Sequence, residues 1–96
     1  MIDTKRKNEG VIVTGAASGI GKAIADMYLA NGYDVIGLDI VHQKTNYPII
    51  ICDVSNESSV AAAFALISER FSAIRYLINC AGIFSQNTEK PLIRYP

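Results

Sequence analysis

The sequence lacks the features that mark nucleic-acid-binding, membrane and secreted proteins. Nine basic and nine acidic side chains cancel, so no excess charge favours nucleic acid or an anionic membrane as a partner. No run approaches the roughly 18 apolar residues of a membrane span. No charged and then apolar leader precedes the first apolar segment. We therefore expect no nucleic-acid partner, no membrane partner and a cytoplasmic location.

Residues that bind metals or carry redox chemistry are equally scarce. The two cysteines, Cys52 and Cys80, fall in expected buried strands, without C-x-x-C spacing or histidine companions. The single histidine, His42, has no cysteine or carboxylate partner at a useful spacing. We expect no metal site, two reduced core thiols, and His42 on the surface of a loop.

What the sequence does contain is a globular composition, with 50% hydrophobic and 19% charged residues in a chain of 96. This length suits one small domain or part of one. We expect a polar tail over 1–9, a core over 10–82 and a loop over 83–96. Hydrophobic patterns predict strands at 10–14, 34–40, 48–54 and 74–80, and helices at 19–30 and 56–71.

Two stripes of apolar residues support the helices. In the first helix the stripe consists of Ile20, Ile24, Met27 and Tyr28, and in the second of Val60, Phe64, Ile67 and Phe71. Ser55 is positioned to cap the second helix. The third strand is almost wholly apolar, as expected for a parallel strand that is buried on both faces.

The order strand, helix, strand, strand, helix, strand predicts the topology. Parallel strands joined by right-handed crossovers give a sheet in the order 3-2-1-4. This is a Rossmann-like, doubly wound α/β sheet. Its ligand crevice opens at the C-terminal ends of the first and fourth strands, where the strand order reverses.

The turn between the first strand and the first helix is rich in glycine. Gly15, Gly19 and Gly21 form the pattern G-x-x-x-G-x-G. A P-loop needs four residues between its glycines and a Ser or Thr after its lysine, whereas five residues separate Gly15 from Gly21 and Ala23 follows Lys22. The common G-x-G-x-x-G spacing also fails.

We interpret this turn as a binding site for a dinucleotide pyrophosphate. The following helix offers unpaired N–H groups and the positive end of its dipole. A side chain at Gly15 would obstruct the turn, and one at Gly19 or Gly21 would hold a phosphate away. A glycine-rich turn without a ligand is the alternative, and the other signals at this edge count against it.

Acidic residues stand at two other strand ends. Asp39 lies 18 residues after Gly21, near the distance at which an acid binds the adenosine ribose, although it could be a plain strand-end aspartate. Its carboxylate would repel a 2′-phosphate and no arginine follows it, so we predict NAD(H) over NADP(H). Asp53 can accept from the adenine amino group, or cap the next helix, and Val54 can form a wall for the ring.

The end of the fourth strand completes the edge. Ala81 and Gly82 allow the backbone to approach a cofactor closely. Asn79 can either contact the cofactor or bond neighbouring main chain, and both roles stay open.

Taken together, these segments resemble the short-chain dehydrogenase/reductase family. The segments are T-G-x-x-x-G-I-G at the first turn, an aspartate ending strand two, C-D-V ending strand three and N-C-A-G ending strand four. The family writes the last motif N-N-A-G, so Cys80 departs from it. The resemblance covers about residues 10–85 and implies cofactor-binding roles for Gly15, Ser18, Gly19, Ile20, Gly21, Asp39, Asp53, Val54, Asn79, Ala81 and Gly82.

The resemblance also implies what this chain lacks. The family transfers a hydride between a nicotinamide and an alcohol or ketone, using a tyrosine with a lysine four residues later, and commonly forms homo-oligomers. None of the five tyrosines here has that lysine. We therefore expect the cofactor-binding, N-terminal portion of a single Rossmann domain, incomplete relative to the family and without catalytic residues, whose fourth strand is an open edge.

Two other functions fit the same residues. One is a complete, non-catalytic dinucleotide-binding sensor or interaction module. It would be favoured by a stop codon directly after Pro96, whereas a coding frame that continues into a Y-x-x-x-K motif favours the enzyme. The other is a different Rossmann ligand, such as a methyl donor, which leaves the N-C-A-G segment unexplained.

Overall fold

The computed structural model describes residues 9–81. The expected loop over 83–96, Gly82 and all of the expected tail except Glu9 lie outside the described residues. The described elements are, in chain order, β1 (Glu9–Thr14), α2 (Gly19–Ala30), β2 (Asp34–Asp39), β3 (Ile49–Ile51), α3 (Glu57–Arg70) and β4 (Ala73–Asn79). All six predicted elements are present, and Glu9 joins β1 by pairing with Ala73.

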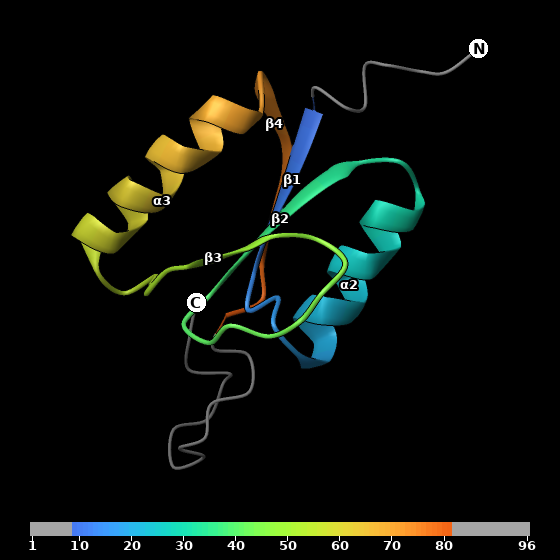
Figure 1. Cartoon of the computed structure of the whole chain (residues 1–96), viewed down its shortest axis with the longest axis horizontal. Helices are drawn as coiled ribbons and strands as arrows, with labels where there is room; N and C mark the ends of the chain where they lie inside the picture. The colour runs from blue at the N-terminus through green and yellow to red at the C-terminus, as the bar shows by residue number, and fades with distance from the viewer. Residues whose placement is uncertain (1–8, 82–96) are drawn as a thin grey trace.

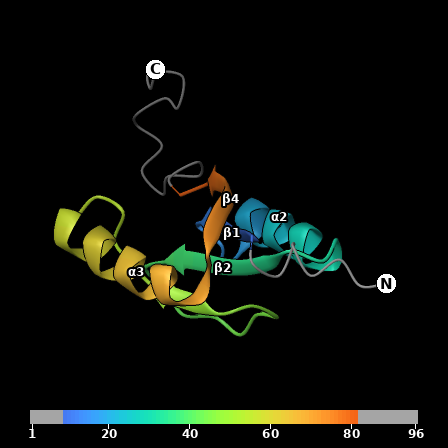
Figure 2. The same ribbon diagram turned by 90° about the horizontal axis from the view of Figure 1, so that it is seen from above.

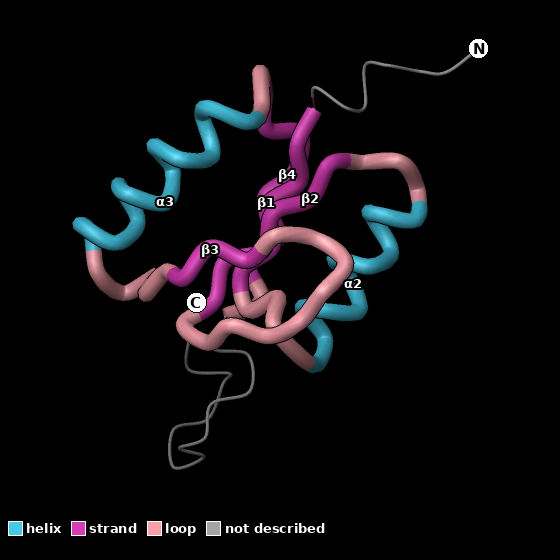
Figure 3. Tube along the Cα trace, viewed as in Figure 1, coloured by secondary structure: helices cyan, strands magenta, loops and turns pink. Residues whose placement is uncertain are grey.

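The four strands form one parallel sheet in the predicted order β3-β2-β1-β4. β1 is central, so that Val11 pairs with Val35 on one side and with Tyr76 on the other. The helices α2 and α3 cover opposite faces of the sheet (Figures 1 and 2). The strands therefore lie between the two helices (Figure 3), which is the doubly wound arrangement.

Alternation along the strands builds two separate cores. Ile12, Ile36 and Leu38 point to the α3 face. There they pack with Ile67 of α3 and with Phe71, the C-cap of that helix. On the α2 face a second cluster consists of Val11, Val13, Ala16, Ala25, Val35 and Tyr47. Because both faces of β1 and β2 are covered, these two strands are buried almost throughout.

The α2 helix packs as predicted only in part. Its buried residues are Gly21 and Ala25, whereas Ile20 and Met27 of the expected stripe are 45% and 53% exposed. Tyr28 of the expected stripe is half-buried and packs against the α2-face cluster. Small residues at the remaining contact positions let the helix lie close to the sheet. The α3 stripe is confirmed, since Ile67 and Phe71 are buried and Val60 and Phe64 pack against them.

The third strand is shorter and more exposed than predicted. β3 spans three residues and pairs only with β2, so it is an edge strand and Ile51 is 55% exposed. The expectation of burial on both faces was therefore wrong, because an apolar run alone does not distinguish a central strand from an edge strand. β4 is the other edge, as expected, and Leu77 on it is 57% exposed.

The cap of α3 is also shifted by one residue. Asn56, not Ser55, is the N-cap, and its side-chain oxygen accepts from the Ser59 N–H at 2.9 Å. Ser55 instead donates to Asp53 from both its hydroxyl and its backbone N–H. Among the described residues, neither helix is long and apolar enough to cross a membrane.

Candidate functional site

A cleft of about 430 Å³ opens at the C-terminal edge of the sheet. It is lined by nine of the eleven residues that the sequence analysis singled out: Gly15, Ser18, Gly19, Ile20, Gly21, Asp39, Asp53, Val54 and Ala81. It is also lined by five residues for which no cofactor-binding role was predicted: Leu38, Ile40, Val41, Cys52 and Cys80. All five stand close to predicted residues at the ends of strands, and this position is the only feature of the sequence that could have indicated them.

The glycines of the turn serve different purposes. Gly15 and Gly19 have φ values of 67° and 63°, in the left-handed region that favours glycine. A Cβ on Gly15 would lie 3.0 Å from the Ala81 nitrogen, whereas a Cβ on Gly19 would meet nothing within 4 Å. Gly15 therefore lets two strand ends approach, and Gly19 faces open space beside the cleft.

Gly21 has a structural role that the sequence analysis did not foresee. A Cβ at Gly21 would lie 2.0 Å from the carbonyl oxygen of Gly15. Glycine is thus required here so that the first turn of α2 can lie against the preceding loop. The predicted reason, clearance for a phosphate, is not needed to explain it.

The start of α2 presents free hydrogen-bond donors to the cleft. Ser18 is the N-cap with an extended backbone, and its side chain makes no capping bond. Within residues 9–81, no acceptor meets the backbone N–H groups of Gly19, Ile20 and Gly21. Three unpaired N–H groups at the positive end of a helix dipole form a site that suits a phosphate.

Asp39 joins the glycine turn to the end of β2. Its Oδ2 accepts from the Ala17 N–H at 2.9 Å, and its Oδ1 accepts from the Val41 N–H at 3.2 Å. Each carboxylate oxygen has room for a second donor, so the side chain can also bind ligand hydroxyls. The sequence analysis found Asp39 but not its bond to the turn.

Asp53 is held in a turn at the end of β3. Its Oδ1 accepts from the Ser55 hydroxyl at 2.6 Å and from the Ser55 N–H at 2.9 Å. These bonds lower the pKa of the Asp53 carboxyl, so it is ionised at neutral pH. The Asp53 side chain is exposed beside the cleft, and Val54 next to it is 45% exposed.

Asn79 is used inside the sheet. Its Oδ1 accepts from the Thr14 hydroxyl at 2.7 Å, and the Thr14 oxygen in turn accepts from the Cys80 and Ala81 N–H groups at 2.8 and 2.9 Å. Among the described residues, Asn79 does not line the cleft. The sequence analysis left its role open. It also assigned no role to Thr14, which begins the T-G-x-x-x-G-I-G segment and is only 5% exposed.

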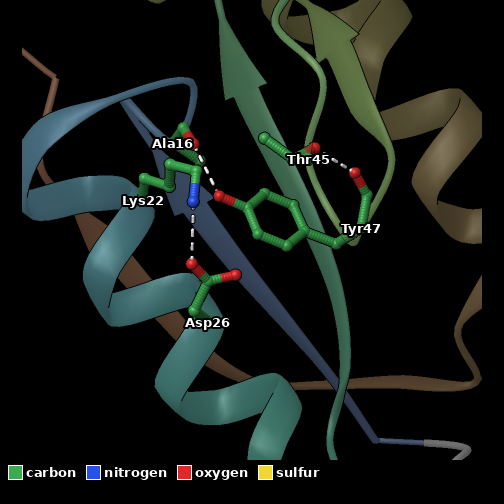
Figure 4. A network of polar contacts seen from close by, with 5 residues as sticks. All are labelled: Ala16, Lys22, Asp26, Thr45 and Tyr47. Carbon is green, nitrogen blue, oxygen red and sulfur yellow. Dashed lines mark hydrogen bonds and ion pairs between the residues drawn. The ribbon is translucent and has the colours of Figure 1, made fainter.

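Tyr47 is hydrogen-bonded to the glycine turn from the loop before β3. Its hydroxyl donates to the Ala16 carbonyl at 2.7 Å, and its ring extends from the loop before β3 towards the glycine turn (Figure 4). Burial, together with the nearby Asp26 and Asp39, raises the pKa of Tyr47 to about 12. The hydroxyl is therefore protonated, and remains a donor, throughout the neutral range.

In α2, Lys22 pairs with Asp26 at 3.0 Å.

The two cysteines and the histidine stand apart from any cluster of metal-binding side chains among the residues that the structure describes. Cys52 and Cys80 are both free thiols, with Cys52 buried and Cys80 half-buried. His42 is exposed in its loop. Across residues 9–81, no group of three or more metal-binding side chains comes together. The polar groups of the cleft suit a ligand with phosphates and hydroxyls.

Comparison with known families gives a consistent result. A family model described as short chain dehydrogenase matches residues 9–94. Over 82 residues the chain is 42% identical to the uncharacterized short-chain type dehydrogenase/reductase y4vI of Sinorhizobium fredii. That match covers 76% of this chain and 15% of the relative.

Solved structures show the same likeness. The ligand-free aldohexose dehydrogenase of Thermoplasma acidophilum has a TM-score of 0.76 and 35% identity, over 95% of this chain and 37% of the other. A 4-hydroxyisoleucine dehydrogenase complexed with NADH has a TM-score of 0.57 and 28% identity, over 65% of this chain and 28% of the other. The chain thus spans little more than a third, or less, of the length of these relatives.

Proposed function

The chain belongs to the short-chain dehydrogenase/reductase family, and we propose that it binds NAD(H) in the cleft at the C-terminal edge of its sheet. For the complete protein, the proposed activity is oxidation of a small-molecule alcohol or reduction of the corresponding ketone. The observation that carries the proposal is that residues at the ends of all four strands line one cleft. This cleft combines unpaired helix N–H groups, the Asp39 carboxylate and the Asp53–Val54 segment.

The pyrophosphate would be held by the start of α2. The N–H groups of Gly19, Ile20 and Gly21 have no acceptor within residues 9–81, and the absence of a side chain at Gly19 keeps the approach open. Ser18 and Gly15 complete the turn around these donors. Ala81, which follows β4, also lines the cleft and brings a second stretch of backbone to it. We propose that Gly82, outside the described residues, does the same.

The adenosine ribose would be bound by Asp39. Its two oxygens can accept from the 2′- and 3′-hydroxyls while they keep their bonds to Ala17 and Val41. A 2′-phosphate in that position would meet a carboxylate, at a cost of up to about 4 kcal/mol per unit charge at 4 Å and an effective dielectric of 20. The residues that follow, Ile40 and Val41, are apolar and offer the phosphate no counter-charge.

The adenine ring would lie against the end of β3. Because the pKa of Asp53 is lowered, its carboxylate is an acceptor for the exocyclic amino group at neutral pH. Val54 and Val41, each about half exposed at the cleft, offer apolar surface to the ring. Asn79 acts in this proposal by holding the edge of the sheet together through Thr14.

The cofactor supplies the redox chemistry, because its nicotinamide accepts or gives up a hydride. The residues of this chain bind and orient it, and none of its tyrosines has a lysine four residues later. We propose that the acid–base residues lie elsewhere in the complete protein. A cytoplasmic, homo-oligomeric enzyme is part of the same proposal, supported by the family and by the two free thiols.

Isothermal titration with NAD⁺ and NADP⁺ tests this function. We expect NAD⁺ to bind about tenfold more tightly or better, and Asp39→Asn to reduce that preference because it removes the repelling charge. Asp34→Asn is the matched control, since Asp34 lies at the other end of β2 and pairs with Arg70 at 2.9 Å. Equal or tighter binding of NADP⁺ by the unmodified protein would refute the NAD preference.

A further inference from the structure

One peptide group in the glycine turn is held at both ends by side chains. The carbonyl of Ala16 and the N–H of Ala17 belong to the same planar peptide. The carbonyl accepts from the Tyr47 hydroxyl at 2.7 Å, and the N–H donates to the Asp39 carboxylate at 2.9 Å. Rotation of this peptide would break both bonds, so its orientation is fixed from two directions.

Tyr47 is itself firmly placed. Its side chain is 4% exposed, and the Thr45 hydroxyl donates to its carbonyl (Figure 4). Gly37 of β2 provides the space it needs, because a Cβ there would lie 3.3 Å from the ring and 2.7 Å from the Ala16 Cβ. A rigid, buried donor beneath a turn can set the geometry of that turn.

The position of the clamped peptide gives it a consequence for binding. It directly precedes Ser18, the N-cap of α2, and the N–H groups of Gly19, Ile20 and Gly21 that have no acceptor within residues 9–81. Ala16 and Ala17 are 0% and 4% exposed, so they contact the interior and not the ligand. Any tilt of their peptide would nevertheless be passed on to the donors that follow.

We propose that Tyr47 is a positioning residue for phosphate binding, which acts through the peptide between Ala16 and Ala17 to aim the N–H groups at the start of α2. The inference rests on the proposed dinucleotide function. It also gives Asp39 a second task, because the carboxylate that selects the sugar completes the same clamp. Replacing Asp39 would therefore loosen the turn as well as change the cofactor preference.

Tyr47→Phe tests the proposal, because it removes only the hydroxyl. The affinities of the full-length protein and of its variants for NADH, ADP and adenosine are measured well below the melting temperature. We expect NADH and ADP to bind about tenfold more weakly to Tyr47→Phe. Adenosine, which has no phosphate, should bind as it does to the unmodified protein. Tyr28→Phe is the matched control, since it removes a hydroxyl from the ring cluster with Tyr33 and Tyr76 and should change none of the three affinities.

The outcomes separate the possible explanations. Unchanged affinities in Tyr47→Phe, or an equal loss for all three ligands, would overturn the positioning role and leave Tyr47 as a packing residue. Failure of the unmodified protein to bind NADH or ADP would overturn the dinucleotide function itself, and this proposal with it. If Tyr47→Phe does not fold, Thr45→Val removes the bond that holds the Tyr47 main chain, and it should give the same order of losses at smaller size; its failure to do so would overturn the role.

Discussion

At the scale of single residues, the three glycines of the turn show that one motif can answer several constraints. Gly15 adopts a positive φ and lies against Ala81, whereas Gly21 must lack a side chain because the Gly15 carbonyl is in the way. Only Gly19 has both a positive φ and open space before it. Substitutions at Gly19 and Gly21 should therefore have different effects.

We predict that Gly19→Leu mainly abolishes dinucleotide binding, while Gly21→Ala mainly destabilises the fold. The leucine side chain would occupy the phosphate approach, and the left-handed backbone adds a strain of about 1–2 kcal/mol. The Gly21→Ala methyl group would overlap the Gly15 carbonyl, with an expected loss of about 1–3 kcal/mol in the free energy of unfolding. Thermal melting and titration with NAD⁺ on both variants check this. Tight NAD⁺ binding by a folded Gly19→Leu would contradict our placement of the phosphates.

At the scale of elements, β1 is the central strand of the sheet, and its C-terminal end is hydrogen-bonded to the segment that follows β4 at the cleft. β1 ends at Thr14. The Thr14 hydroxyl donates to the side chain of Asn79 and accepts from the N–H groups of Cys80 and Ala81. One buried side chain thereby sets the position of the segment that follows β4. This link explains why a threonine suits a place where the apolar strand stops.

We predict that Thr14→Val destabilises the protein more than Asn79→Ala. Valine has a similar shape, but it leaves two backbone N–H groups without their acceptor, which costs about 1–3 kcal/mol for a buried group. Asn79→Ala removes one hydrogen bond and leaves both N–H groups paired with Thr14, so about 0.5–1.5 kcal/mol is expected. Urea denaturation of both variants measures the difference. A larger loss in Asn79→Ala would show that the amide, and not the hydroxyl, carries the link.

The elements could be predicted from the sequence because their patterns are local. Short runs of apolar residues placed β1 and β2, and the strand order followed from the connections between parallel strands. The length and burial of β3 could not be predicted in the same way. An edge strand and a central strand can carry the same apolar run, and only pairing with neighbours distinguishes Ile51 from a core residue.

The candidate site was predictable where it depends on strand ends, and hidden where it depends on long-range contacts. Asp39 and Asp53 were found because both follow apolar strands. The roles of Tyr47 and Thr14 were missed, because their partners Ala16 and Ala81 are 31 and 67 residues away and no spacing rule connects them. The true role of Gly21 was hidden for the same reason, since it depends on how a helix lies against a loop.

At the scale of the whole molecule, the described residues form one cleft at the C-terminal edge of a sheet that has two exposed edge strands. β3 and β4 are both edge strands, and Leu77, Ile74 and Tyr76 of β4 are each more than a third exposed. The matched relatives are longer, since this chain spans 37% of the aldohexose dehydrogenase. A direct test of one shared site therefore needs a bound ligand that contacts residues at several of the four strand ends.

A crystal structure of the protein grown with millimolar NAD⁺ tests this most directly. We predict density for the pyrophosphate against the N–H groups of residues 19–21 and for the adenosine ribose hydroxyls at the Asp39 carboxylate, with the adenine beside Asp53. A dinucleotide whose adenosine lies away from the ends of β2 and β3, or a cleft that stays empty at that concentration, would contradict the account.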